Sequence, residues 1–290
     1  MSELIRLGEH SYYIPSHPNV GVFVEDGRAY LLDSGLNETQ AAEYLRLIQE
    51  QGWTLQAVFN THYHADHVGG NHYLQEVTGC GCYCPMPAFA NDPVLNPSTL
   101  FGAYPPEAFH TDIFLAQACQ AENLTQDILP QGLRLIPLPG HCRVQYGIMT
   151  CDEVFYCADA VIGEEELDRF KISHLYDLDA YFASMELLEA TPAKWYVPSH
   201  ETALRDIREL VARNRQSCLD LIDWILADCA GEGLTHDALL KAVFDRIGRK
   251  LHLVQYALSG CTLRAYLSYL LDRKQLSVQV RENLLYFRTV

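Results

Sequence analysis

The segment LQAVFNTHYHADHVGGN, residues 55–71, joins a short apolar run to a dense group of histidine and aspartate side chains. The run LQAVFN has the length and composition of a buried β-strand. His62, His64, Asp66 and His67 follow it, and imidazoles and carboxylates are metal ligands by type. Residues two apart point to different sides of a helix but share a side of an extended segment. The spacing of His62 and His64 therefore predicts a strand that ends in a metal-binding loop.

The same arrangement, a potential ligand directly after a strand-like run, recurs three times. His141 follows LRLIPLPG, Asp159 follows VFYCA, and His200 follows KWYVPS. Strand ends at one edge of an α/β sheet gather into a common crevice, so we expect these residues to join the histidine group. Asp66 and His67 are displaced in phase from His62 and His64, which predicts a second metal ion beside the first.

Asp33, in LLDSG, also ends a strand-like run. Two interpretations stay open for this residue. Its carboxylate could orient a ligand histidine without touching the metal, or it could simply form a turn.

The first two hundred residues alternate strand-like and helical stretches, which is an α/β pattern. SYYIP, NVGVFVED and RAYLLDS predict an antiparallel meander with a hairpin turn at Asp26–Gly27, followed by a helix over residues 38–52. Later strands are predicted in LRLIPLPGH, YGIMTCDE, VFYCADA and KWYVPSH, with a turn at Asp152–Glu153 and a helix in DLDAYFASMELLEA. The proline-rich stretch from residue 85 to 130 is irregular at first and is expected to be an ordered surface excursion, not a core element, that can cover a site.

The character of the chain changes after residue 200, where long amphipathic helices replace the alternation. We therefore predict two domains, residues 1–202 and residues 203–290. The first 200 residues carry eight Lys and Arg against 26 Asp and Glu, and the last 90 carry thirteen against eleven. Helices at 203–229, THDALLKAVFDRIG and CTLRAYLSYLLDRKQ, then the strands LSVQV and LLYFRTV around Arg281–Asn283, suggest a winged-helix-like module.

Composition limits the classes of function. With 49% hydrophobic and 20% charged residues, the 290-residue chain is typical of a globular protein. A formal net charge of −16 disfavours coating of nucleic acid or an anionic membrane. No apolar run approaches the ~18 residues of a membrane span, and the first residues lack a signal peptide, so we expect a cytoplasmic protein. Its ten cysteines are expected to be free and mostly buried, including Cys80, Cys82 and Cys84 in a predicted strand.

The order of these motifs resembles the metallo-β-lactamase superfamily of hydrolases over residues 1 to about 200. The resemblance implies an αββα sandwich with a dinuclear metal site, here followed by a small helical domain. It also implies the ligand sets: His62, His64 and His141 for one metal, Asp66, His67 and His200 for the other, and a bridging Asp159. Zinc is the default metal, with iron or manganese as alternatives.

Two cations that share a water lower its pKa toward neutrality, which supplies a hydroxide nucleophile without a nucleophilic side chain. Asp66 is then expected to orient this hydroxide or to handle its proton, which makes it the catalytic residue. A nucleophilic Cys142 beside His141 is the competing interpretation. It is disfavoured because a metal-bound histidine cannot also act as a free base.

The substrate is less defined. THYHADHVGGN resembles the glyoxalase-II-like thioesterases, but we find no match for the basic residues with which those enzymes hold glutathione. Persulfide dioxygenases share part of the motif and use one iron. The helical tail resembles that of the β-lactamase-like protein 2 group, some of which cleave RNA. Residues predicted to line an apolar substrate pocket are Phe101, Tyr104, Phe109, Tyr146 and His174, each also explicable as packing.

Three hypotheses follow: a hydrolase of a small ester, thioester or lactone, a metal-dependent endoribonuclease or phosphodiesterase, and a binding protein that keeps the fold. The intact ligand set argues against the third. A modest basic surface from Arg246, Arg249, Lys250, Arg264, Arg273 and Lys274 would serve the second. Repulsion by the acidic first 200 residues favours the first, with a small molecule as the partner, a homodimer left open and no membrane.

Overall fold

The computed structural model describes residues 3–290 and contains two main β-sheets. The first has seven strands in sequence order: β1 (Ile5–Arg6), β2 (Ser11–Ile14), β3 (Val20–Glu25), β4 (Arg28–Leu32), β5 (Thr54–Phe59), β6 (Gly81–Cys84) and β7 (Ala121–Asn123). Strands β1 to β4 are antiparallel and β4 to β7 parallel. The predicted meander is thus confirmed, with positive φ at Asp26 (51°) and Gly27 (73°) as a two-residue hairpin turn requires.

The second sheet has the order β11-β10-β9-β8. Its strands are β8 (Leu133–Pro137), β9 (Tyr146–Thr150), β10 (Val154–Ala158) and β11 (Trp195–Pro198). Strands β8, β9 and β10 are antiparallel, with the predicted turn before β10 at Asp152–Glu153, and β11 pairs parallel to β10. The four predicted strand positions are therefore confirmed.

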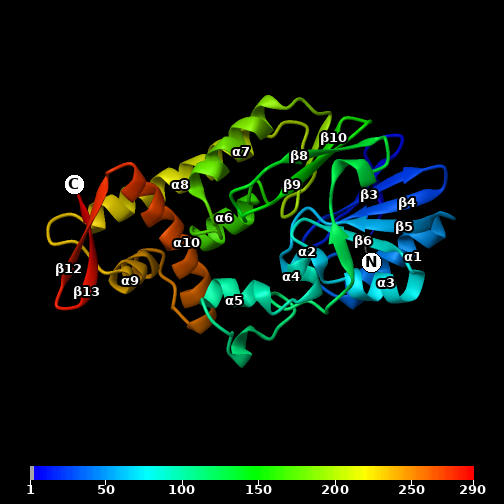
Figure 1. The fold of residues 1–290 in the computed structure, drawn as a ribbon. Coiled ribbons are helices and arrows are strands. Elements are labelled where there is room, and N and C mark those ends of the chain that lie inside the picture. Colours follow the sequence, from blue (N-terminus) through cyan, green and yellow to red (C-terminus); the bar gives the residue numbers. More distant parts are fainter. Residues whose placement is uncertain (1–2) are drawn as a thin grey trace.

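Helices cover the outer face of each sheet (Figure 1). Helices α1 (Glu38–Glu50) and α3 (Asn71–Thr78) pack on the first sheet, and α7 (Leu178–Ala190) and α8 (Arg208–Asp228) pack on the second. Apolar residues of both sheets, among them Phe23, Phe59, Ile148 and Tyr156, form a third core between them. These layers make the αββα sandwich that the resemblance implied.

Local signals explain where two of the covering helices, α1 and α7, begin. The side chain of Asn37 accepts a hydrogen bond from the Gln40 backbone N–H at the start of α1. Asp177 does the same for the Ala180 N–H at the start of α7. Asn and Asp are favoured at this position because the first N–H groups of a helix have no partner within it. Helix α7 then follows the predicted bounds within a few residues.

The stretch from residue 85 to 130 is more regular than expected. It contains α4 (Ala88–Asn91), α5 (Leu95–Phe101), the 3-10 turns η1 (Glu107–Phe109) and η2 (Gln126–Ile128), and strand β7. Pro97 is compatible with α5 because it lies in the first turn of this helix, where no N–H donor is needed. The stretch is ordered, as expected, but it also enters the core, since Phe109 is fully buried.

Residues 203–290 form a helical region that ends in a hairpin. After α8 come α9 (His236–Arg246), α10 (Leu253–Asp272) and the strands β12 (Leu276–Arg281) and β13 (Leu284–Thr289). Helix α10 begins at Leu253, eight residues before its predicted start at Cys261. Gly260 therefore lies inside the helix, and its carbonyl oxygen is 3.0 Å from His236 Nε2. One apolar core runs from the second sheet through α7 and α8 to α9, α10 and Phe287. The boundary at 202/203 and the winged-helix-like assignment stay predictions.

The ten cysteines are free, as expected, and all are buried except Cys151 and the half-buried Cys261. Among residues 3–290, no helix is both long and apolar enough to cross a membrane.

Candidate metal centre

Both sheets deliver potential ligands to one edge of the sandwich. The loop after β5 carries His62 and His64 and leads into α2 (Ala65–Val68), which carries Asp66 and His67. The segments after β8, β10 and β11 bring His141, Asp159 and His200 to the same place. All seven residues predicted from sequence therefore lie together, as expected of strand ends that share an edge.

Three imidazoles converge in the first group of ligands. His64 Nδ1 lies 3.1 Å from His62 Nε2 and 2.9 Å from His141 Nε2. Four nitrogen or oxygen ligands around a zinc ion at ~2.05 Å would be about 3.3 Å apart. His62 is fully buried and His141 nearly so, which removes water as an alternative partner. The three nitrogens are thus placed for one cation.

Burial makes protonation of this group unfavourable. It lowers the pKa of His62, His64 and His141 below the usual range, and their mutual proximity lowers that of His62 and His64 further. A neutral imidazole has one N–H donor and one nitrogen with a free lone pair. His64 Nδ1 can therefore not donate a hydrogen bond to both His62 Nε2 and His141 Nε2 with one proton. A cation at their centre would satisfy all three.

The second group consists of Asp66, His67 and His200. Asp66 Oδ2 lies 3.7 Å from His67 Nε2 and 3.8 Å from His200 Nε2. The Asp66 side chain is 24% exposed, whereas that of His67 is fully buried. Asp66 is therefore the ligand of this group that solvent and substrate reach first.

Asp159 lies between the two groups. Its Oδ2 is 3.3 Å from His141 Nε2 and 3.6 Å from His200 Nε2, and its Oδ1 is 3.5 Å from His67 Nε2. Burial of the carboxyl raises its pKa, but the surrounding imidazoles lower it well below the usual range. An ionised carboxylate in this position contacts ligands of both groups, as a bridging residue must.

Several buried polar atoms at the centre lack a hydrogen-bond partner among the described residues. They are His67 Nε2, Asp159 Oδ1 and His200 Nδ1. Orphaned buried polar atoms cost about 1–3 kcal/mol each and are rare in native proteins. Two of them, His67 Nε2 and Asp159 Oδ1, face the second group. Together with the nitrogen and carboxylate donors, they fit a site that can hold metal ions.

Asp33 supports the second group from behind. Its Oδ1 accepts the Thr61 backbone N–H (2.7 Å), and its Oδ2 accepts the Thr61 hydroxyl (2.8 Å) and lies 2.9 Å from His67 Nδ1. Burial lowers the pKa of His67, but Asp33, Asp66 and Asp159 together raise it well above the usual value. The contact with His67 favours the orienting interpretation over a simple turn, although Asp33 also has a positive φ of 69°.

A cavity of about 300 Å³ opens beside these residues. Its polar end consists of His64, Asp66, His141, Asp159, His174 and His200. Its apolar wall consists of Leu100, Ile113, Phe114, Ile162, Phe170, Ile172, Phe244, Ile247 and Leu258. The site is therefore a metal-type centre at one end of an apolar pocket.

Of the residues predicted to line this pocket, only His174 does so. Its backbone oxygen accepts from His141 Nδ1 (3.1 Å), and burial lowers the pKa of its imidazole to about 3. Phe101 instead packs against the buried Phe109, Tyr104 is 75% exposed, and Tyr146 packs into the core between the sheets. The structure therefore does not place these three residues in the lining of the cavity, and α5 presents Leu100 there instead of its neighbour Phe101.

Sequence reasoning missed two sets of residues. Glu166, on α6 (Glu164–Phe170), lies 3.7 Å from His200 Nδ1, and His17 stacks on the His200 ring. Residues of α9 and α10 supply part of the apolar wall. Neither set has a local motif, and both reach the centre only through tertiary folding.

Cys142 is an unsuitable nucleophile. Its thiol is buried, its Sγ donates to the Val144 carbonyl (3.3 Å), and burial raises its pKa above the usual value. The thiolate is the nucleophilic form of cysteine. The geometry therefore also disfavours a Cys–His mechanism.

Solved structures with similar folds extend over nearly the whole chain. A β-lactamase domain protein from Burkholderia ambifaria superposes with a TM-score of 0.74 at 17% identity, covering 99% of this chain and 93% of that one. A metallo-β-lactamase family protein from Thermus thermophilus gives 0.68 at 18% identity, covering 99% and 98%. A metallo-β-lactamase from Pontibacter korlensis gives 0.57 at 16% identity, covering 75% and 98%. At these identities the likeness shows the fold alone.

Sequence comparison identifies curated relatives over a short stretch. A hydroxyacylglutathione hydrolase of Hyphomonas neptunium is 38% identical over 65 residues, which is 21% of this chain and 24% of the relative. The corresponding protein of Methylococcus capsulatus is 42% identical over 64 residues, 20% and 25% of the two chains. These matches span about a quarter of the relatives' length. The model of the metallo-β-lactamase superfamily matches residues 13–200, which include all seven candidate ligands, and the chain belongs to this superfamily.

Proposed function

We propose that this chain is a dinuclear metal-dependent hydrolase of a small ester, thioester or lactone. The observation that carries the proposal is the pair of ligand groups, joined by Asp159, at the end of an apolar cavity. Nitrogen and carboxylate donors in this number favour zinc. Two bound cations would lower the pKa of a shared water and polarise the carbonyl oxygen under attack.

The residues of the chain have separate tasks in this scheme. His62, His64 and His141 hold one cation in a dry environment, which strengthens its effect on charge. Asp66 is partly exposed at the cavity and is placed to hold the proton of the attacking water or to pass it to the leaving group. No nucleophilic side chain is needed.

The apolar walls of the cavity favour an organic substrate with a substantial apolar part. The relatives named hydroxyacylglutathione hydrolase point to thioester cleavage. Glutathione itself carries two carboxylates and an amine, and such a ligand suits a more polar pocket. A thioester or ester with a less polar leaving group fits these walls better.

A nuclease is supported less well. Of the six basic residues named for such a surface, Arg246 pairs with Asp228 and Arg273 pairs with Asp179. Arg249 lines the cavity. The excess of acidic residues in the first 200 positions adds repulsion of a polyanion.

The test combines metal content with activity. Purified protein is analysed for metal per chain and assayed with ester, thioester and phosphodiester reporters, alongside the His62→Ala/His141→Ala double variant. We expect about two zinc ions per chain and metal-dependent cleavage of an ester or thioester, both lost in the double variant.

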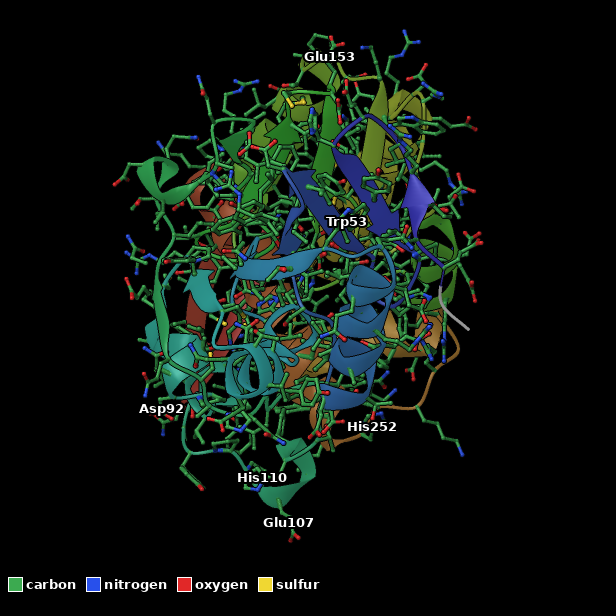
Figure 2. The ribbon with its side chains drawn as sticks, turned by 90° about the vertical axis from the view of Figure 1, so that its right-hand side faces the viewer. Trp53, Asp92, Glu107, His110, Glu153 and His252 are labelled. Carbon is green, nitrogen blue, oxygen red and sulfur yellow. The ribbon has the colours of Figure 1, made fainter. Side chains whose placement is uncertain are left out.

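A matched control is the His110→Ala/His252→Ala double variant, which removes two exposed imidazoles outside the centre (Figure 2). It should keep full metal content and activity. One iron per chain, cleavage of the phosphodiester alone, or hydrolysis that survives metal removal would each contradict the proposal.

A further inference from the structure

The region after residue 203 builds one wall of the cavity at the metal centre. Phe244 and Ile247 reach it from α9, and Gln255, Leu258 and Ser259 reach it from α10. Helix α10 also contacts η1 and α5, and α5 lies beside it in Figure 1. The C-terminal helices thus contribute part of the wall of the cavity at the metal centre.

Arg249 stands at this wall, in the loop between α9 and α10. Among the described residues that line the cavity, it is the one Lys or Arg. Its Nη1 donates to the Arg169 carbonyl (3.0 Å), and its guanidinium carbon lies 4.8 Å from the centre of the Phe170 ring. These contacts fix the direction of the side chain from outside the C-terminal region.

These contacts hold the Arg249 guanidinium in place, but no carboxylate of residues 3–290 pairs with its positive charge. Within the described residues, no carboxylate lies within 4.0 Å of it, unlike Arg246, which pairs with Asp228 at 2.8 Å. One hydrogen bond to a carbonyl leaves most of its five N–H donors available. A partly exposed arginine in an otherwise apolar wall is therefore free to bind an anion.

We infer that Arg249 selects substrates that carry a single carboxylate at the end of the apolar group remote from the scissile bond. The metal centre and Arg249 both line the cavity, and apolar side chains make up most of the wall that they share. The matching ligand has a cleavable carbonyl at one end, an apolar chain in the middle and an anion at the other end. This inference rests on the proposed hydrolase function and names the substrate class.

A carboxylate fits better than a phosphate. A carboxylate carries one negative charge and takes two parallel N–H donors from one guanidinium. A doubly charged phosphate group would need a further cation, and among the described residues no second Lys or Arg lines the cavity. The carboxylate of Glu166, which also lines the cavity, would add repulsion against a second negative charge.

The test compares matched pairs of aryl thioesters: the half-thioesters of succinate, adipate and suberate against the thioesters of butanoate, hexanoate and octanoate. Each pair has the same chain length and differs in the terminal carboxylate. In the wild type, we expect at least one dicarboxylic member to be preferred by about 10- to 100-fold in kcat/KM, mainly through KM, because the remote contact is the same in ground and transition states.

Three variants locate the effect. Arg249→Gln should abolish the preference by lowering kcat/KM for the carboxylate-bearing thioesters far more than for the neutral ones, and Arg249→Lys should retain part of the preference. Lys250→Gln removes the same charge from an exposed neighbour that does not line the cavity, and it should keep the preference. A preference that persists in Arg249→Gln, or equal losses on charged and neutral thioesters, would overturn the assignment.

Failure of this inference can be distinguished from failure of the proposed function. Metal-dependent cleavage of the neutral thioesters without any preference for a carboxylate leaves the hydrolase intact and overturns the role of Arg249. If no thioester or ester is cleaved, the hydrolase proposal fails. Calorimetric binding of the monoanilides of the same diacids to the metal-free protein then decides the inference: equal affinity for hexananilide and adipic monoanilide, or affinity unaffected by Arg249→Gln, would refute it.

Discussion

The Asp33 carboxylate contacts three donor groups: the backbone N–H and the hydroxyl of Thr61, and His67 Nδ1. These contacts predict the effect of a single substitution. Asp33→Asn keeps the size of the side chain and the positive φ of 69°, which Asn tolerates. It replaces an acceptor by an NH₂ group facing either Thr61 or His67. Loss of such a partner typically lowers metal affinity about 10- to 100-fold. We expect this loss in a chelator-competition assay.

Asp152 provides the matched control for this prediction. Its Oδ2 accepts the His10 backbone N–H (2.7 Å), far from the metal centre. Burial raises the pKa of Asp152, but hydrogen bonds from Ser11 and from the backbone at His10 lower it below the usual value. Asp152→Asn should therefore reduce stability above the unfolded-state pKa of about 4 without changing metal affinity. Equal effects of the two variants on metal affinity would argue against an orienting role for Asp33.

Cys142 offers a second prediction, which separates two mechanisms. Cys142→Ala removes a buried thiol next to His141 and leaves a small cavity, at a cost of about 1 kcal/mol in the free energy of unfolding. Because the proposed mechanism uses no side-chain nucleophile, kcat should stay within about threefold of the wild type. Steady-state kinetics on the best reporter substrate checks this, and a loss of several orders of magnitude would favour a Cys–His mechanism instead.

Single residues were predictable where their chemical type and their strand context agreed. His62, His141 and His200 each follow an apolar run, and the structure brings them together. The pocket aromatics were not predictable, because Phe101 and Leu100 are adjacent and only the rotation of α5 decides which one faces the cavity. Arg249 appeared in the sequence as one of several basic residues, and its isolation in an apolar wall is a property of the fold.

At the scale of elements, α2 must approach the turn after β4 closely, and Gly69 makes this approach possible. A Cβ built on Gly69 would lie 2.0 Å from the Leu36 carbonyl oxygen, far inside van der Waals contact. The Ser34 N–H donates to the His67 carbonyl (2.9 Å) at the same junction. This contact sets the depth at which α2 presents Asp66 and His67.

Gly69→Ala should therefore push α2 outward and weaken the second ligand group more than the first. We expect metal content to fall from about two ions to about one per chain, with a loss of about 1–3 kcal/mol in the free energy of unfolding. Elemental analysis and urea unfolding measure the two quantities. Gly231→Ala is the control, since Gly231 also resists substitution (φ 71°) but faces open space. Retention of both metals in Gly69→Ala would show that the junction tolerates displacement.

Elements were predicted best where one local signal dominated. Asp26–Gly27 and the alternating strands around it defined the meander, and Asp177 marked the start of α7. The short helices between residues 85 and 130 were not predicted from this proline-rich composition, although Pro97 fits the first turn of α5. Helix α6 and helix α3 were not predicted, since both are short and their packing is decided by the sheets beneath them.

At the scale of the whole molecule, the helical region does not have a separate core. Buried residues of the second sheet, of α7 and α8, and of α9 and α10 form one apolar cluster. Asn214 of α8 strengthens this union, because its side chain bonds both the N–H and the carbonyl of Ile162, at 2.8 and 2.9 Å. The sequence showed the change in element type after residue 200, but not that the two parts share their core, because core membership depends on tertiary contacts.

We therefore expect the chain to unfold in one cooperative transition. The three tryptophans report on three layers: Trp53 at the start of β5, Trp195 in β11 and Trp224 in α8. Variants that retain one tryptophan each, followed by fluorescence in urea, should give coincident midpoints. Leu240→Ala, in the core of α9, should lower all three midpoints together by a common loss of about 2–5 kcal/mol, and added zinc should raise all three. A Trp224 transition at lower urea than the other two would instead establish residues 203–290 as an independently unfolding domain.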